Sequence, residues 1–161
     1  MNQTQGEKGA GTSDYLLEQF VDLSRVLTGY ERVELLGTGM AEAYYRAITD
    51  IYKETVLRLL FEAKAIFEVY GEGHPDFEEQ IRTRILQGIE FAQVAKNIMQ
   101  LWYVGSITNF NNADFSTNTW VISPEAYVNS LVWEAAGSHP AGAKYPGYGS
   151  WSLKPQTLEK A

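Results

Sequence analysis

Apolar side chains recur every three or four positions over most of the stretch between Leu16 and Trp102. This spacing places them on one face of a helix with 3.6 residues per turn, whereas a half-buried strand would require strict alternation. Glycines interrupt the pattern at Gly29 and within residues 71–73, where a helix can end. The chain is therefore expected to be all-α, an irregular bundle of about five or six helices.

Four apolar stripes define the expected core. The first helix is expected to start near the capping candidates Thr12, Ser13 and Asp14, and the fourth to have Pro75 at its first helical position. A bend is expected near Gly88. The stripes consist of Leu16, Leu17, Phe20, Leu23 and Leu27; of Val33, Leu36, Met40, Tyr44, Ala47 and Ile51; of Val56, Leu59, Leu60, Ala63, Ile66, Phe67 and Tyr70; and of Phe77, Ile81, Ile85, Phe91, Ala95, Ile98 and Trp102.

The helical pattern ends after Gly105. Residues 109–114 are rich in asparagine, which predicts a loop, and residues 119–122 favour a short extended piece. Residues 123–125 read Ser-Pro-Glu, which predicts a new helix start, and Gly137 predicts its stop.

The C-terminal segment 137–161 carries aromatic residues in a context that excludes regular structure. Glycines and prolines between residues 137 and 155 forbid a regular helix or a central strand. Tyr145, Tyr148 and Trp151 nevertheless lie there, and such side chains are enriched at protein interfaces. The expected organisation is a flexible N-terminal segment 1–13, a helical domain 14–136, and an extended coil 137–161 that packs on this domain or on a partner subunit.

Composition narrows the function classes. The net charge is -7 and no basic stripe is available to neutralise phosphates, which argues against nucleic-acid binding. The chain has no cysteine, so disulfides, thiolate nucleophiles and cysteine-ligated metals are excluded. No run of about 18 apolar residues occurs, so no transmembrane segment is expected.

Residues 1–14 contain neither a twin arginine nor the apolar centre of a signal peptide. The chain as it stands is therefore expected to be cytoplasmic. A periplasmic location is the alternative, if a twin-arginine signal is missing from this sequence or is carried by a partner.

The sequence offers no compact set of catalytic or ligand residues. His74 and His139 each precede a proline in a glycine-rich turn, without a second ligand at metal-binding spacing, and are expected to be surface turn residues. The helical carboxylates, among them Glu31, Glu62 and Glu68, fit solvated helix faces, since the Glu-x-x-His repeat of di-iron bundles is absent. No catalytic, cofactor-binding or metal-binding residue is therefore expected in this chain.

Three blocks of sequence together resemble a known family. Residues 20–29 resemble the "LS..LTG" opening of its mature chains, and residues 98–105 resemble its "I...WY.G" signature. Residues 127–133, followed by residues 151–155, resemble the helix and the terminal "W..KP" that end its chains. The family is the small (gamma) subunit of membrane-associated FAD-dependent sugar and polyol dehydrogenases. It includes the small subunits of sorbitol, fructose and glucose dehydrogenases and the related subunit 3 of gluconate dehydrogenase.

The resemblance implies a non-catalytic accessory subunit, bound to a large flavoprotein subunit of the glucose-methanol-choline oxidoreductase type. In such complexes the small subunit supports the folding, stability and assembly of the flavoprotein and is exported with it. FAD is expected in the partner and no cofactor in this chain, and a cytochrome c subunit could be a further partner that receives electrons. The expected partner interface consists of Trp133, Tyr145, Tyr148, Trp151, Lys154 and Pro155.

Two features depart from the family pattern. Family members commonly have a cysteine shortly before the terminal motif, whereas residues 141–149 contain none, so a disulfide tie is absent. The export signal is also absent from the sequence, which puts the export role in question.

Two other functions remain open. A free-standing carbohydrate-binding or interaction protein would use the C-terminal aromatic residues as a platform. An α-helical enzyme with a dispersed carboxylate site is neither indicated nor excluded by the sequence.

Overall fold

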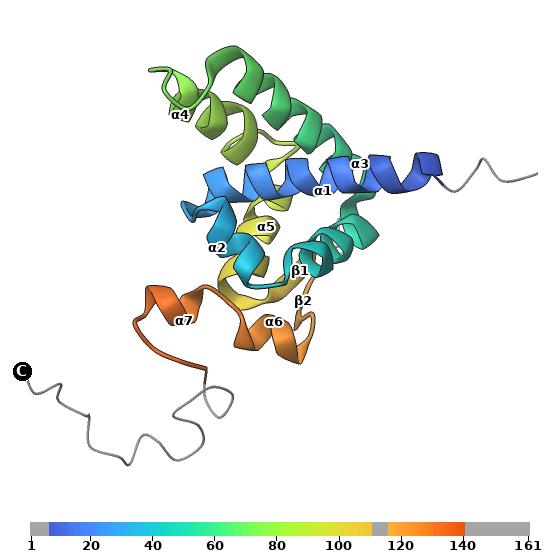
Figure 1. Cartoon of the computed structure of the whole chain (residues 1–161), viewed down its shortest axis with the longest axis vertical. Coiled ribbons are helices and arrows are strands. Elements are labelled where there is room, and N and C mark those ends of the chain that lie inside the picture. The colour runs from blue at the N-terminus through green and yellow to red at the C-terminus, as the bar shows by residue number, and fades with distance from the viewer. Residues whose placement is uncertain (1–6, 111–115, 141–161) are drawn as a thin grey trace, which may run out of the picture.

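The computed structural model describes residues 7–110 and 116–140, with side chains from residue 14 onward. This part of the chain is mostly helical and also contains one two-stranded antiparallel sheet (Figure 1). The elements in chain order are α1 (Glu7–Thr28), α2 (Arg32–Gly37), α3 (Ala41–Tyr70), α4 (Phe77–Gln80), the π-helical η1 (Ile81–Leu86), α5 (Ala92–Val104), β1 (Ser106–Phe110), β2 (Thr117–Val121), α6 (Pro124–Val128) and α7 (Val132–Ala135).

The three long helices α1, α3 and α5 contact one another in pairs and enclose the core. In Figure 1, α1 crosses the middle of the molecule. The end of α3 with α4 lies above it, and α6 and α7 lie below it. The hairpin β1–β2 follows directly from the end of α5, so the late elements all gather at the lower end.

The first stripe is confirmed in its centre, and its glycine stop is confirmed too. Phe20 and Leu23 are fully buried, and Gly29 has the positive φ of 76° that follows a helix end. The start differs, because α1 already begins at Glu7. The capping candidates at residues 12–14 therefore lie inside the helix.

The prediction for the second stripe is wrong at its beginning. Leu35 is fully buried, whereas Leu36 is 45% and Val33 75% exposed. The reason is the break between α2 and α3, where Gly39 adopts φ 70° and changes the direction of the chain. A stripe extrapolated across such a break loses its phase, because helical periodicity holds only within one helix.

The remainder of the second stripe and the third form one helix. α3 runs for 30 residues and departs from helical geometry at Tyr52, with φ -124° and ψ 34°. The predicted core positions of the third stripe are confirmed, since its apolar residues from Val56 to Ile66 are buried. The predicted stop is confirmed as well, because Gly71 ends α3 with φ 57°.

The fourth stripe is confirmed, but its boundaries are not. Asp76 is the N-cap residue of α4, so Pro75 belongs to the preceding turn and not to the first helical position. The expected bend at Gly88 is instead a helix end. η1 stops at Leu86, and a Cβ at Gly88 would lie 2.5 Å from the carbonyl oxygen of Arg84.

The sheet corrects the all-α prediction. Residues 117–121 form β2, which confirms the expected extended piece, but β1 covers residues 106–110 and overlaps the predicted loop. The two strands pair with Thr108 opposite Thr119. The asparagine-rich composition predicts a loop, but hydrogen bonds from Tyr52 of α3 and Asn97 of α5 to the backbone of Thr108 and Phe110 stabilise the strand.

The predicted helix start at residues 123–125 and the predicted stop at Gly137 are confirmed. Ser123 caps α6, with its Oγ accepting a hydrogen bond of 3.1 Å from the backbone N–H of Ala126, and Pro124 is the first helical residue. The helix is shorter than predicted, because the chain turns at Asn129 and resumes as α7. Gly137 follows α7 with φ 59°, as expected of a stop.

The indole of Trp102 lies at the centre of this arrangement, at the C-terminal end of α5. It is fully buried, stacks on Phe20 of α1 at 6.4 Å between ring centroids, and meets Tyr44 of α3 edge-on at 4.8 Å. The Trp102 carbonyl oxygen accepts a 2.9 Å hydrogen bond from the backbone N–H of Leu131. One residue thus connects the three long helices to the chain that enters α7.

We expect Trp102→Ala to lower the free energy of unfolding by about 3–5 kcal/mol, as a large-to-small change in a closely packed core. Denaturation in urea, followed by far-ultraviolet circular dichroism, measures this change. The matched control is Val104→Ala, on the exposed side of the same helix, which should change the stability by less than about 0.5 kcal/mol. Equal stability of Trp102→Ala and the parent would contradict the structural role of the indole.

Candidate functional site

The sequence blocks that carry the family resemblance meet in space as far as they are described. Phe20 of the first block stacks on Trp102 of the second, and the Tyr103 hydroxyl donates a 2.8 Å hydrogen bond to the Thr28 carbonyl oxygen at the end of α1. The second block reaches the third through the bond between Trp102 and Leu131. Most of the residues in these blocks are therefore explained by packing and hydrogen bonding within this chain.

Gly105 explains the glycine of the second block. It ends α5 with φ 67°, and a Cβ there would lie 2.5 Å from the carbonyl oxygen and 3.0 Å from the Cβ of Ala126. The same turn is closed by a 3.0 Å hydrogen bond from the backbone N–H of Ile122 to the Gly105 carbonyl oxygen. Only a glycine combines this backbone conformation with so close an approach to α6.

Of the predicted interface residues, the structure places Trp133. Its ring meets that of Tyr127 edge-on at 5.2 Å, and its Nε1–H donates a 2.7 Å hydrogen bond to the Tyr127 carbonyl oxygen. The half-buried ring also lines a cavity of about 450 Å³ together with side chains of α2 and of the turn after α7. The cavity is lined by Glu34, Gly37, Thr38, Asn129, Ser130, Leu131, Trp133, Glu134, Ser138, His139 and Pro140.

The other predicted interface residues, Tyr145, Tyr148, Trp151, Lys154 and Pro155, lie outside the described residues. The cavity at Trp133 is bordered by Pro140, the last described residue before them. The described chain therefore ends at the cavity that contains Trp133.

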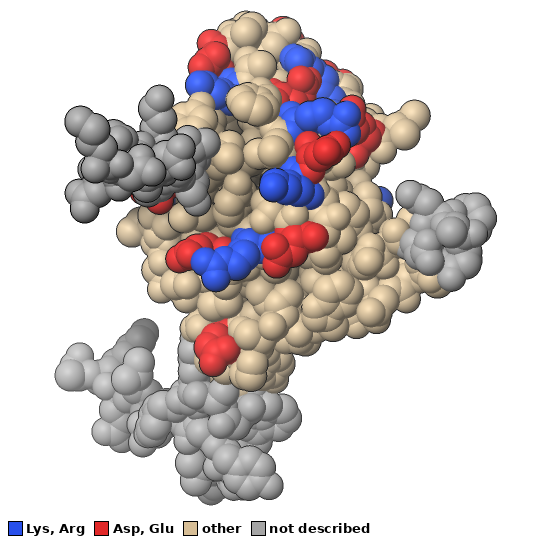
Figure 2. Space-filling view, turned by 90° about the vertical axis from the view of Figure 1, so that its right-hand side faces the viewer, with Lys and Arg blue, Asp and Glu red and all other residues tan. Residues whose placement is uncertain are grey.

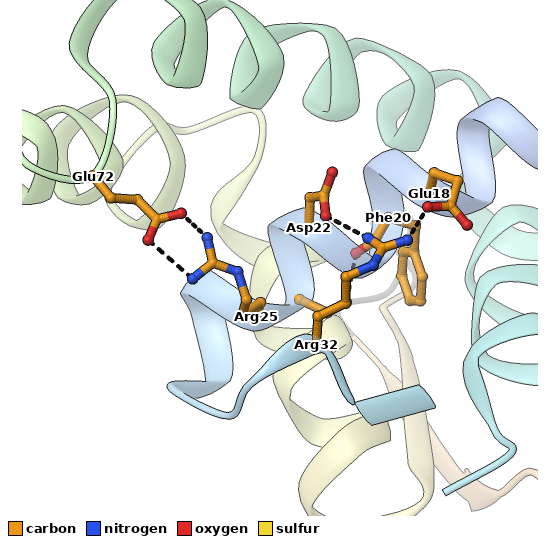
Figure 3. Close-up of polar contacts among 7 residues, drawn as sticks. Glu18, Phe20, Asp22, Arg25, Arg32 and Glu72 are labelled. Atoms are coloured by element: carbon orange, nitrogen blue, oxygen red, sulfur yellow. Dashed lines mark hydrogen bonds and ion pairs between the residues drawn. The ribbon is translucent and has the colours of Figure 1, made fainter. Parts of the chain in front are cut away.

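A cluster of charged side chains surrounds α1, where Arg25 and Arg32 form ion pairs (Figure 3). Arg32 of α2 binds Glu18 and Asp22 of α1, and Arg25 binds Glu72 in the loop after α3. Both guanidinium groups are engaged by carboxylates of this chain, and they join α1 to the elements on either side. We interpret these pairs as structural contacts.

Burial raises the pKa of the Asp22 carboxyl above its ordinary value, and the nearby charge of Arg25 offsets part of this effect. The carboxylate is thus less favoured here than in water, which fits a partly desolvated structural pair.

The histidines do not form a site together. His74 is exposed, its Nδ1 accepts a 3.1 Å hydrogen bond from the backbone N–H of Asp76, and its ring meets that of Tyr70, so the prediction of a surface turn residue is confirmed. His139 is half-buried at the cavity beside Trp133. Within residues 7–110 and 116–140, no group of three His, Asp or Glu side chains is arranged to hold a metal ion.

A charge-poor surface at the lower end of the molecule escaped the sequence reasoning. Residues 97–143 contain no lysine or arginine, and their acidic residues are only Asp114, Glu125 and Glu134. The described part of this stretch forms the end of α5, the hairpin, α6 and α7. In Figure 2, charged side chains gather over the upper part of the face, and few lie toward its lower end.

Exposed apolar side chains accompany this depletion of charge. On the hairpin, Trp120 is 38% and Val121 50% exposed, and Phe110 is also exposed. Interface cores are depleted of charge and enriched in aromatic residues, so the combination is typical of a surface that binds another protein. The available sequence signal was the long run without lysine or arginine.

Comparisons with models of protein families, with curated proteins and with solved structures returned no match. Among the described helices, none is both long enough and apolar enough to cross a bilayer.

We expect Gly105→Ala to destabilise the protein by about 1–3 kcal/mol or more, because alanine is strained at this φ and its Cβ would press on Ala126. Gly37→Ala is the matched control. Gly37 has no atom within 4 Å of an added Cβ and lies at the end of α2, so this variant should be neutral or more stable by up to about 1 kcal/mol. Thermal and urea unfolding of the two variants would test the contrast, and equal effects would contradict it.

Tyr44 generates a pH-dependent prediction. Burial raises the pKa of its phenol above the ordinary value of about 10. Because the pKa is raised in the folded state, stability is fully present below about pH 10 and is lost as the pH rises above that value. Tyr44→Phe should therefore lose less stability than the parent between about pH 9 and 11. Urea midpoints across this range test the prediction, and parallel losses in both proteins would contradict it.

Proposed function

We propose that this chain is a non-catalytic accessory subunit, the small (gamma) subunit of an FAD-dependent sugar or alcohol dehydrogenase complex. The observation that carries the proposal is the charge-poor surface of the hairpin, α6 and α7, with its exposed aromatic and branched side chains. This surface lies at the end of the molecule from which the aromatic segment 141–161 continues. In the proposal, this surface and the aromatic segment that follows it in the sequence bind one partner together.

The arrangement of the resemblance blocks supports this assignment. The first two blocks and the part of the third from Tyr127 to Trp133 contribute to a single packed core, which fits a scaffold role for these motifs. The remaining residues, Trp151 to Pro155, lie outside the described residues. In the proposal they bind the large subunit, with Tyr145, Tyr148 and Trp151 as aromatic anchors.

The proposed partner is a large flavoprotein subunit of the glucose-methanol-choline oxidoreductase type, which holds the FAD and the substrate. The small subunit would cover an apolar surface of that partner and so stabilise its folded and assembled form, since any ligand that binds only the native state stabilises it. Electrons would pass from the flavin to a cytochrome c subunit.

A second candidate function follows from the cavity beside Trp133. It combines an aromatic ring with hydroxyl, amide and carboxylate side chains, among them Asn129 and Glu134, and its size suits a small polyol. This chemistry would fit a free-standing carbohydrate-binding protein. Titration of the isolated chain with monosaccharides, followed by tryptophan fluorescence, separates the two functions, because saturable binding favours the second.

The decisive experiment is co-expression of the full chain with the flavoprotein encoded in the adjacent reading frame. That neighbour should contain the Gly-x-Gly-x-x-Gly of a dinucleotide-binding fold. We expect a tagged small chain to purify with an equimolar yellow partner, and omission of the small chain to lower the yield of soluble flavoprotein. Flavin absorbance in the small chain alone, or sugar-dependent dye reduction by it, would contradict the proposal.

We expect Trp151→Ala to weaken subunit association by roughly 30-fold or more, because truncated interface aromatics often cost about 2 kcal/mol. The melting temperature of the isolated chain should change little. Calorimetric titration of the two purified subunits measures the effect. Phe61→Ala is the matched control, since this exposed aromatic lies on α3, outside the charge-poor surface. A lower melting temperature with unchanged association would mean that the segment packs on its own domain.

A further inference from the structure

The two outer edges of the hairpin differ in whether other described residues hydrogen-bond to their backbone groups. On β1, Asn97 of α5 acts like a neighbouring strand. Its Nδ2 donates to the Thr108 carbonyl oxygen at 2.8 Å, and its Oδ1 accepts from the Thr108 backbone N–H at 3.0 Å. The Tyr52 hydroxyl donates to the same carbonyl oxygen at 3.1 Å and accepts from the Phe110 backbone N–H at 3.4 Å. The outer edge of β1 is therefore closed by helical side chains.

The register shows which groups of β2 face outward. Thr108 uses its backbone groups for Asn97, so the pair Thr108 and Thr119 is a non-hydrogen-bonded pair of the ladder. Their hydroxyl groups lie 2.8 Å apart, as expected for the closer spacing of such a pair. In an antiparallel ladder the backbone N–H and C=O groups of Thr117, Thr119 and Val121 then point away from β1.

No described residue pairs with this outward row of backbone groups, and all five residues of β2 are exposed. Proteins usually protect such an edge with a charged side chain, a proline, a bulge or a covering element. The strand, Thr-Asn-Thr-Trp-Val, contains no charge and no proline. Within residues 7–110 and 116–140, β2 is thus an unprotected edge, whereas the β1 edge is closed.

We propose that the outer edge of β2 binds an extended segment of the large subunit by strand addition, forming a third antiparallel or parallel strand of this sheet. The inference rests on the proposed function for the identity of the partner. The segment would be uncharged and would carry apolar side chains at alternate positions, because the edge lies within the charge-poor surface and is flanked by Trp120 and Val121. A charged strand would lose its hydration there without an opposite charge to meet.

A second copy of this chain fits the edge less well. Antiparallel pairing of two β2 strands about Thr119 would join only five residues from each copy. A stable interface of standard size needs about 20–30 residues on each side. A large subunit that also contacts α6, α7 and the segment 141–161 can reach this size, with the added strand setting its orientation.

The hairpin is held rigidly enough for this role. In addition to Asn97 and Tyr52, Gln100 Nε2 donates to the hydroxyl groups of Ser106 at 2.9 Å and Thr108 at 3.1 Å. These bonds attach β1 to α3 and α5, and β1 in turn holds β2 through the ladder. A strand acceptor that is ordered before binding loses less conformational entropy when its partner arrives.

Amide hydrogen exchange of the full chain, alone and in complex with the large subunit, gives a specific test. We expect the amides of Thr117, Thr119 and Val121 to slow on complex formation. The amides of Asn118 and Trp120 already face β1 and should change little. Uniform protection of all five would indicate simple covering and would overturn strand addition, as would no protection at all.

Two substitutions isolate the backbone bond at the centre of the strand. Thr119→Pro removes the outward N–H and should weaken association about tenfold or more. The isolated chain should still fold, because an edge strand tolerates a proline whose missing N–H would point away from the sheet. Thr119→Val keeps the N–H, removes the hydroxyl contact with Thr108, and should associate like the parent. Thr117→Pro, at the first position of the strand, provides the same loss of an outward donor if Thr119→Pro fails to fold. Full association of both folded proline variants would overturn the proposal.

The outcomes separate this proposal from the proposed function. A flavoprotein complex that forms normally with the proline variants keeps the accessory role and overturns strand addition. If no flavoprotein associates, the proposed function fails. The probe for the strand edge is then a six-residue peptide of alternating threonine and valine with blocked termini. If this peptide does not produce the alternating protection pattern, the proposal that β2 accepts a strand is overturned. Alternating protection that is already present in the dilute isolated chain, or that grows with its concentration, would assign the edge to its own C-terminal segment or to a second copy.

Discussion

The packing of the Trp102 indole between Phe20 and Tyr44 is the contact on which the rest of the structure depends. It brings the three long helices together, and the backbone of the same residue receives the chain that leads into α7. The indole Nε1–H has no hydrogen-bond partner among the described residues, an omission that costs about 1–3 kcal/mol in a buried site. The aromatic contacts must outweigh this cost. The structural contribution of Trp102 therefore comes from the size and shape of its ring.

Charged residues are distributed unevenly on the two sides of this central contact. Charged residues lie mainly on the elements before α5, where pairs such as Arg32 with Asp22 join neighbouring helices. The elements after it form a surface almost free of charge, with an aromatic segment continuing from its edge. In the first part, ion pairs within the chain engage both Arg25 and Arg32. In the second part, the uncharged exposed side chains are the basis of the proposed accessory role.

Much of the helical core could be predicted, and the errors have identifiable causes. Within α3 the period of 3.6 residues places every buried position from Val56 to Ile66 correctly, because one continuous helix has one phase. The exchange of Leu35 for Leu36 arises at Gly39, which interrupts that phase. β1 was not predicted because its strand conformation depends on hydrogen bonds from other elements. Asn97 of α5 and Tyr52 of α3 supply these bonds, and no local sequence pattern indicates them.

The sequence by itself determined the helical character of the chain, most of its helix stops and the charge-poor run from residue 97 to 143, since periodicity, glycine conformation and charge are local properties. It also led to the prediction of a partner, because aromatic residues lie among glycines and prolines that disfavour a regular helix or a central strand. The tertiary structure alone decided that the described parts of the resemblance blocks meet around Trp102 and that Trp133 borders a cavity. It also decided that described residues close the β1 edge of the hairpin and leave the β2 edge open. These features depend on contacts between residues distant in the chain, and no local pattern specifies which distant groups will satisfy one another.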